Sequence, residues 1–210
     1  MRKAALIATI AALAAVPAIA NVNIGDPAPS ISAGSWFNLP EGLSSLSSKH
    51  LKGRLVMVEF WATWCKPCRA GIPHLVDMQR KYKNKGLVLV ALSYEPGSKV
   101  GPFVGQNDMS YIVGAEADSM QDALGIRGYP TAILIDPDGK VAWKGHPLDA
   151  EEVIERLLRT KPPKVVGALG VDLDASLVAE ATQNPGNPRL TAFPAVYPAM
   201  LAAVILTTRS

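Results

Sequence analysis

Apolar residues are arranged along the chain in blocks that predict alternating strands and helices. Residues 55–61 and 87–92 are apolar runs rich in branched side chains, with the length of buried strands. Between them, apolar residues recur at helical spacing over residues 65–82, where Pro73 is expected to kink the helix. Gly86 ends that helix. A strand–helix–strand order of this kind makes the two strands parallel neighbours.

The second half of the chain predicts shorter elements. Asp136-Pro137-Asp138-Gly139 is typical of a hairpin turn, and Asp149 with Glu152 three residues later resembles a capping box. A strand or hairpin is also expected nearer the N-terminus, around residues 30–38. Together these elements predict an α/β fold with a central mixed sheet flanked by helices. The expected elements are helices at 99–106 and 119–124, strands at 111–113, 131–135 and 140–144, and a closing helix from Asp149 to Leu158.

The N-terminal segment has the pattern of an export signal. Arg2 and Lys3 precede an uncharged apolar run, and Ala18-Ile19-Ala20 gives a small-x-small cleavage pattern. This predicts a signal peptide over residues 1–20 and a mature chain that starts at Asn21. An uncleaved membrane anchor is the alternative. Both interpretations place the domain outside the cytoplasm, in the periplasm or cell envelope.

The C-terminal segment differs in character from the domain expected over residues 21–161. A proline pair opens an extension, residues 162–210, and residues 190–208 contain no charge. One interpretation is a C-terminal anchor that gives weak membrane association. Pro194 and Pro198 interrupt the segment, so a packed or irregular extension is the alternative.

Composition and charge narrow the class of protein. A hydrophobic fraction of 49% and a charged fraction of 19% are typical of a globular chain. The net charge is +3, and without Arg2 and Lys3 basic and acidic residues nearly balance. A nucleic-acid-binding protein would concentrate basic residues on one face, so this class is excluded.

The chain has only two cysteines, Cys65 and Cys68. A secreted fold held together by disulfides would spread several cysteines along its length. A pair three residues apart closes almost no loop, so it adds little stability and is better explained as reactive. A zinc site would need two more ligands, and the chain offers only three histidines. We therefore expect neither a metal nor an organic cofactor.

The position of the pair predicts the role of each sulfur. Cys65 lies where the strand gives way to the helix, and free N–H groups and the helix dipole favour a thiolate there. Lys66 adds a neighbouring positive charge, and Pro67 suits the first helical turn. Cys65 is therefore predicted to attack from a solvent-accessible position. Cys68, one turn further along, is predicted to resolve the mixed disulfide.

Several motifs together resemble one known family. Residues 60–69, Phe-Trp-Ala-Thr-Trp-Cys-Lys-Pro-Cys-Arg, closely resemble the active-site segment of thioredoxin-like proteins. With Gly25-Asp26-Pro27-Ala28-Pro29 ahead of it, the segment is most similar to the exported TlpA/ResA branch of thiol–disulfide oxidoreductases. Pro73 and Gly128-Tyr129-Pro130-Thr131 match further features of the thioredoxin-like fold. The resemblance spans roughly residues 23–160.

The resemblance implies roles for residues away from the cysteines. Pro130 would have a cis peptide bond and face the cysteines, and the backbone of Tyr129 would pair with the substrate polypeptide. Trp64 would form part of the exposed docking surface. Glu59 matches the position of a buried acid that could exchange a proton with Cys68, although a solvent-facing strand residue is the alternative. Gly71 departs from the glutamate that many ResA-type proteins have there.

The sequence thus predicts an exported, monomeric oxidoreductase that exchanges its dithiol or disulfide with cysteines of other proteins. A reductase in an oxidising compartment must be recharged, which implies a membrane thiol donor as a partner. Two alternatives remain open. One is a peroxiredoxin-like peroxide reductase, although Thr63 is two residues from Cys65 and not the three expected. The other is a redox-inert binding module with the same fold.

Overall fold

The computed structural model of the chain describes residues 22–164 and Leu169, all of them within one compact unit, Met1–Gly170. The predicted signal peptide and most of the predicted C-terminal extension, including its apolar segment, lie outside the described residues. Within the described part, no helix is long and apolar enough to cross a membrane.

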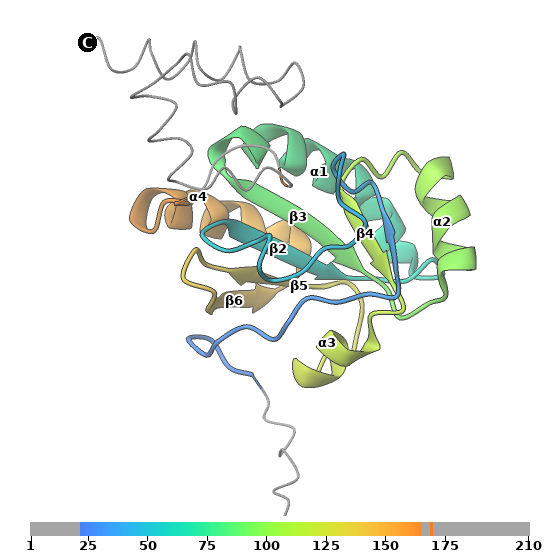
Figure 1. Cartoon of the computed structure of the whole chain (residues 1–210), viewed down its shortest axis with the longest axis horizontal. Coiled ribbons are helices and arrows are strands. Elements are labelled where there is room, and N and C mark those ends of the chain that lie inside the picture. The colour runs from blue at the N-terminus through green and yellow to red at the C-terminus, as the bar shows by residue number, and fades with distance from the viewer. Residues whose placement is uncertain (1–21, 165–168, 170–210) are drawn as a thin grey trace, which may run out of the picture. The chain divides into compact units, whose positions relative to one another are not determined.

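The described residues form one six-stranded mixed sheet in the order β1-β4-β3-β2-β5-β6 (Figure 1). β2 and β3 are parallel, with Leu55 opposite Leu87 and Phe60 opposite Leu92, which confirms the prediction for the two apolar runs. β5 lies antiparallel on the other side of β2, so β2 is fully inside the sheet. The strands are β1 (Ser35–Phe37), β2 (Leu55–Phe60), β3 (Leu87–Leu92), β4 (Ile112–Ala115), β5 (Thr131–Ile135) and β6 (Val141–Gly145).

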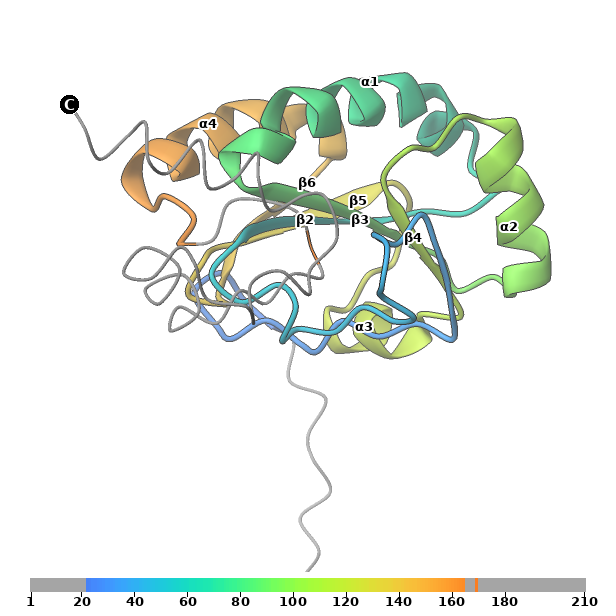
Figure 2. The same cartoon turned by 45° about the horizontal axis from the view of Figure 1, so that its top comes forward.

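Helices cover both faces of this sheet, as the sequence predicts. Figure 2 shows α1 and α4 side by side over one face and α3 on the opposite face. The helices are α1 (Lys66–Tyr82), α2 (Gly97–Gln106), α3 (Asp118–Ala123) and α4 (Ala150–Thr160), with 3-10 turns η1 (Lys83–Lys85) and η2 (Pro147–Asp149).

The alternation of side chains along β2 divides the core into two clusters. Leu55 and Met57 point into a cluster with residues of α1, α2 and α4. Val56 and Val58 point into the other cluster, with α3 and the N-terminal segment. Because β2 and β3 are buried along their whole length, the end of β2 is held firmly where it leads into α1. That junction contains both cysteines.

Two predicted features differ in the structure. The strand or hairpin expected over residues 30–38 is only the short β1, which pairs with β4 and not with a hairpin partner. Asn38 adopts a left-handed conformation (φ 57°) and ends the strand. Asp149 is the N-cap of α4 but makes no capping hydrogen bond from its side chain. The preceding turn η2 leads directly into α4, so Asp149 lacks the extended backbone that a capping box requires.

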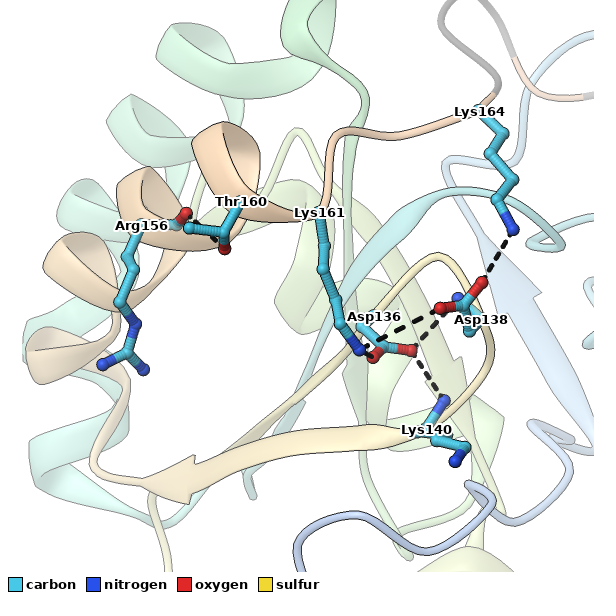
Figure 3. Close-up of polar contacts among 7 residues, drawn as sticks. All are labelled: Asp136, Asp138, Lys140, Arg156, Thr160, Lys161 and Lys164. Atoms are coloured by element: carbon cyan, nitrogen blue, oxygen red, sulfur yellow. Dashed lines mark hydrogen bonds and ion pairs between the residues drawn. The ribbon is translucent and has the colours of Figure 1, made fainter.

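The predicted hairpin between β5 and β6 is confirmed, and Asp136 organises it. Its Oδ1 accepts hydrogen bonds from the backbone N–H groups of Asp138 (3.0 Å) and Lys140 (2.9 Å). Its Oδ2 lies 2.6 Å from Nζ of Lys161, just after α4, and Lys164 pairs with Asp138 at 2.7 Å (Figure 3). These contacts fix the end of α4 to the hairpin, on the turn that joins β5 to β6.

A buried hydroxyl connects α1 to α4. The Tyr82 hydroxyl lies 2.7 Å from Oε1 of Glu155 and 2.9 Å from Oε1 of Glu151. Nζ of Lys81 also lies 2.6 Å from Oε1 of Glu151. Burial raises the pKa of Tyr82 to about 12, so the hydroxyl remains a donor at neutral pH.

We expect Tyr82→Phe to lower the free energy of unfolding by about 1–2 kcal/mol, because a charge-assisted hydrogen bond is lost. Urea denaturation of the oxidised protein measures this. Arg80→Ala is the control, since Arg80 pairs with Asp77 (2.9 Å) where both side chains are 70% exposed. Its effect should stay within about 0.5 kcal/mol. Equal losses in the two variants would contradict a specific role for the hydroxyl.

Candidate active site

The two cysteines form a disulfide at the start of α1, with their Cα atoms 5.3 Å apart. Cys65 is the N-cap of the helix and has extended backbone angles (φ −73°, ψ 100°). Its Sγ accepts a hydrogen bond from the backbone N–H of Cys68 at 3.2 Å. Pro67 lies in the first turn, and no acidic residue does. After reduction, the same N–H and the helix dipole would therefore stabilise a thiolate at Cys65.

Both cysteine side chains are buried, whereas Cys65 was expected to be accessible to solvent. Cys65 and Cys68 are each only 2% exposed and belong to the core cluster that also contains Ile72. The prediction of a solvent-accessible Cys65 is therefore wrong for the disulfide form. The residues between them, Lys66 and Pro67, are exposed. Attack on a partner requires that the disulfide first be reduced, which frees Cys65 from its bond to Cys68.

Three aromatic side chains gather beside the disulfide from three separate loops. The indole N–H of Trp64 donates to the Tyr94 hydroxyl at 2.9 Å. Tyr94 stacks on Tyr129 with ring centroids 6.1 Å apart, and Trp64 meets the Tyr129 ring edge-on at 6.0 Å. Trp64 is 60% exposed and Tyr94 is 39% exposed, so the group presents apolar surface to solvent. The exposure expected of Trp64 is confirmed, whereas sequence reasoning missed Tyr94.

The loop before β5 has the predicted backbone. The Tyr129–Pro130 peptide bond is cis, as the resemblance implies. Tyr129 packs against the core cluster that includes both cysteines, and its hydroxyl donates to the side-chain oxygen of Gln121 on α3. Burial is the largest cause that raises the pKa of Tyr129. The structure thus brings Tyr129 and Trp64 together at the disulfide.

Glu59 is buried in the middle of the sheet, not turned to solvent. It is 2% exposed, and its strand neighbours on either side are Ala91 and Ala132, two small side chains. Strand alternation points Glu59 into the cluster that contains the cysteines. Burial raises its pKa from 4.5 to about 8. The hydroxyl of Tyr111 is buried in the same cluster, without a hydrogen-bond partner among the described residues.

A second buried carboxylate, Glu95, was not anticipated. It follows β3 and is 3% exposed. Its two oxygens accept hydrogen bonds from the backbone and the hydroxyl of Thr63, two residues before Cys65. A glutamate at the carboxyl end of a parallel strand, next to the strand that leads into the cysteines, was the available signal.

Gly71 is the position where the sequence departs from the ResA-type pattern. A Cβ placed there would meet no atom within 4 Å. Packing therefore does not exclude a larger residue at this position. The chain differs from the ResA-type pattern here because it lacks the carboxylate, not because it lacks the space for one. Across the described residues, no three acidic, histidine or cysteine side chains gather in a way that could hold a metal ion.

Comparison with known proteins agrees with this geometry. The model of the Redoxin family matches residues 23–158. A thiol-disulfide oxidoreductase ResA from Bacillus thuringiensis subsp. konkukian is 35% identical over 117 residues, which cover 55% of this chain and 68% of the relative. ResA of Bacillus subtilis (strain 168) is 33% identical over 93 residues, which cover 43% of this chain and 52% of that relative. The crystal structure of a thiol:disulfide interchange protein DsbE from Chlorobium tepidum has 30% identity and a TM-score of 0.56, and the match covers 66% of this chain and 97% of that one.

Proposed function

The chain belongs to the redoxin family and is a ResA-like thiol–disulfide oxidoreductase with a thioredoxin-like fold, and we propose that it reduces disulfides of exported proteins. The observation that supports this best is the cysteine disulfide at the N-cap of α1. Such a pair exchanges with other disulfides without any organic cofactor.

In this reaction the reduced protein attacks with Cys65. The thiolate displaces one sulfur of the substrate disulfide, so a bond forms between Cys65 and the other substrate sulfur, and the displaced thiolate takes up a proton. Cys68 then loses its proton and attacks Cys65. This closes the Cys65–Cys68 disulfide and releases the second substrate thiol. Two electrons have passed from the protein to the substrate, and an external dithiol must restore the reduced pair.

Glu59 is the group that would exchange the proton of Cys68. Its pKa of about 8 lies close to the value of about 8.5 of an ordinary thiol, so a proton can pass either way at little cost. A carboxylate with an ordinary pKa would be too weak a base for this step at neutral pH. The role fits the burial of Glu59 on the face of the sheet shared with the cysteines.

The surface around the disulfide would hold the substrate chain. In this proposal the backbone of Tyr129 pairs with the substrate beside Pro130, and Trp64 contacts its side chains. Lys66 and Pro67 are exposed between the two cysteines and would meet the substrate as well. The partners are protein thiols and disulfides, which the oxidoreductase assignment requires.

We place the mature protein, which starts at Asn21, outside the cytoplasm as a monomer recharged by a membrane thiol donor. The export pattern of the first twenty residues supports this location. The proposed domain is then residues 21–161, followed by an extension over residues 162–210. N-terminal sequencing of the exported protein tests the cleavage, which should leave Asn21 as the first residue.

The reduction potential of the Cys65–Cys68 pair tests the direction of the reaction. We expect a value near that of thioredoxin, about −270 mV, when the protein is equilibrated against dithiothreitol and glutathione mixtures. A value near −120 mV would identify an oxidant instead. Absence of a reversible two-electron transition would favour a redox-inert binding module. Consumption of hydrogen peroxide faster than of protein disulfides would favour a peroxide reductase.

A further inference from the structure

Backbone hydrogen bonds hold both ends of the segment between β2 and α1. The N–H of Trp61 donates to the carbonyl of Leu92 (3.1 Å), which continues the pairing of β2 with β3 by one step. The N–H of Cys65 donates to the carbonyl of Ala62 (3.0 Å), which closes a tight turn. The N–H of Thr63 lies between these two bonds and has no strand carbonyl to pair with, because β3 ends at Leu92.

The side chain of Glu95 takes the place of that missing carbonyl. Its Oε2 accepts the N–H of Thr63 at 2.5 Å, and its Oε1 accepts the Thr63 hydroxyl at 2.9 Å. The hydroxyl of Ser93 adds a further bond to Oε2 at 3.3 Å. One buried carboxylate therefore fixes both the backbone and the side chain of a residue in the turn that presents Cys65.

Lys99 balances the charge of this carboxylate. Its ammonium group hydrogen-bonds to Oε1 of Glu95 from the first turns of α2. Burial alone would raise the pKa of Glu95, but the bonds from Lys99 and Thr63 outweigh it and hold the pKa below its usual value. The group thus remains an anion that accepts all of these hydrogen bonds, while Lys99 reduces its repulsion of a nearby thiolate.

We infer that Glu95 is a positioning residue for the attacking sulfur: it anchors Thr63 so that Cys65 remains at the N-cap of α1, with its Sγ facing the N–H of Cys68. The inference rests on the proposed function, in which Cys65 attacks. If the anchor is lost, the turn from Ala62 to Cys65 loosens and the thiolate spends less time in the stabilising position. Nucleophilicity then falls and the pKa of the Cys65 thiol rises.

Thr63→Val is the most direct test, because it removes one hydrogen bond to Glu95 and changes no charge or volume of consequence. We would measure alkylation of Cys65 by iodoacetamide across pH in the full chain with Cys68→Ser, which leaves one thiol. Thr63→Val should lower the rate at neutral pH by about threefold to tenfold and move the midpoint to higher pH. Thr63→Ser retains the hydroxyl and should restore both values. Glu95→Gln should lower the rate as well.

The matched control is Asp136→Asn. Asp136 is also 3% exposed, also accepts hydrogen bonds from backbone N–H (two of them, against one for Glu95) and also pairs with a lysine, but it lies in the β5–β6 hairpin (Figure 3). Asp136→Asn should reduce stability to urea and leave the alkylation profile of Cys65 unchanged.

The outcomes separate positioning from stability and from the proposed function. Slower alkylation in Thr63→Val and Glu95→Gln, with recovery in Thr63→Ser, supports the inference. Alkylation profiles equal to the parent in both variants overturn it, whatever happens to their stability. If the intact protein exchanges with no protein disulfide, the proposed function fails, while the single-thiol alkylation profiles still decide the inference.

Discussion

Cys68→Ser is expected to convert the protein into a trap that retains its substrates as mixed disulfides. Cys65 can still attack, because the N-cap position and the backbone N–H of residue 68 are preserved. The second step has no sulfur to complete it, so turnover should fall by roughly a thousandfold or more. Non-reducing electrophoresis with mass spectrometry should show covalent adducts at Cys65 that a reductant releases.

Cys65→Ser is the matched variant, since it removes the other sulfur of the same disulfide. It should lose turnover to the same extent and form few adducts, because Cys68 is the resolving residue further along α1. Equal trapping by both variants would show that either sulfur can attack. Adducts formed mainly by Cys65→Ser would reverse the assigned roles.

The central strands of the sheet could be predicted from the local sequence pattern, because burial on both faces favours an apolar residue at each position. Leu87–Leu92 is a strand over the predicted residues, since each side chain faces one of the two apolar clusters. β4 extends to Ala115, beyond the predicted residues 111–113, because Ser35 and Trp36 of β1 pair with it there, and the local apolar run does not encode that long-range pairing. The absent side-chain cap at Asp149 follows from the turn ahead of it, which the capping pattern does not encode.

The candidate active site likewise contains residues that the sequence could predict and residues that only the fold brings together. Cys65, Pro67 and Cys68 are adjacent in sequence, so their place at a helix start could be inferred from the chain itself. Glu95 is 32 residues from Thr63, and Tyr94 is 30 residues from Trp64, so these contacts exist only once β2 and β3 lie side by side. The cis bond before Pro130 was expected only through family resemblance, because spacing and composition do not report it.

Glu59 is expected to make the protein less stable as the pH rises. Its pKa is about 8 in the folded chain, against 4.5 for an unperturbed glutamate. Between these values the folded protein binds a proton that the unfolded chain has released, so the free energy of unfolding falls with increasing pH. The loss begins near the lower pKa and is complete above about pH 8, where it amounts to up to about 5 kcal/mol.

Glu59→Gln should remove this dependence, because the amide keeps the size of the side chain but cannot ionise. Urea denaturation of the oxidised proteins between about pH 5 and pH 9 should give similar stabilities at the acidic end and a variant several kcal/mol more stable at the alkaline end. The histidines are common to both proteins and cancel in the difference. Glu152→Gln, at an exposed position in α4, is the control and should keep the wild-type slope. Parallel curves for Glu59→Gln and the wild type would mean that Glu59 is already ionised in the folded protein, and its role as proton carrier for Cys68 would then be lost.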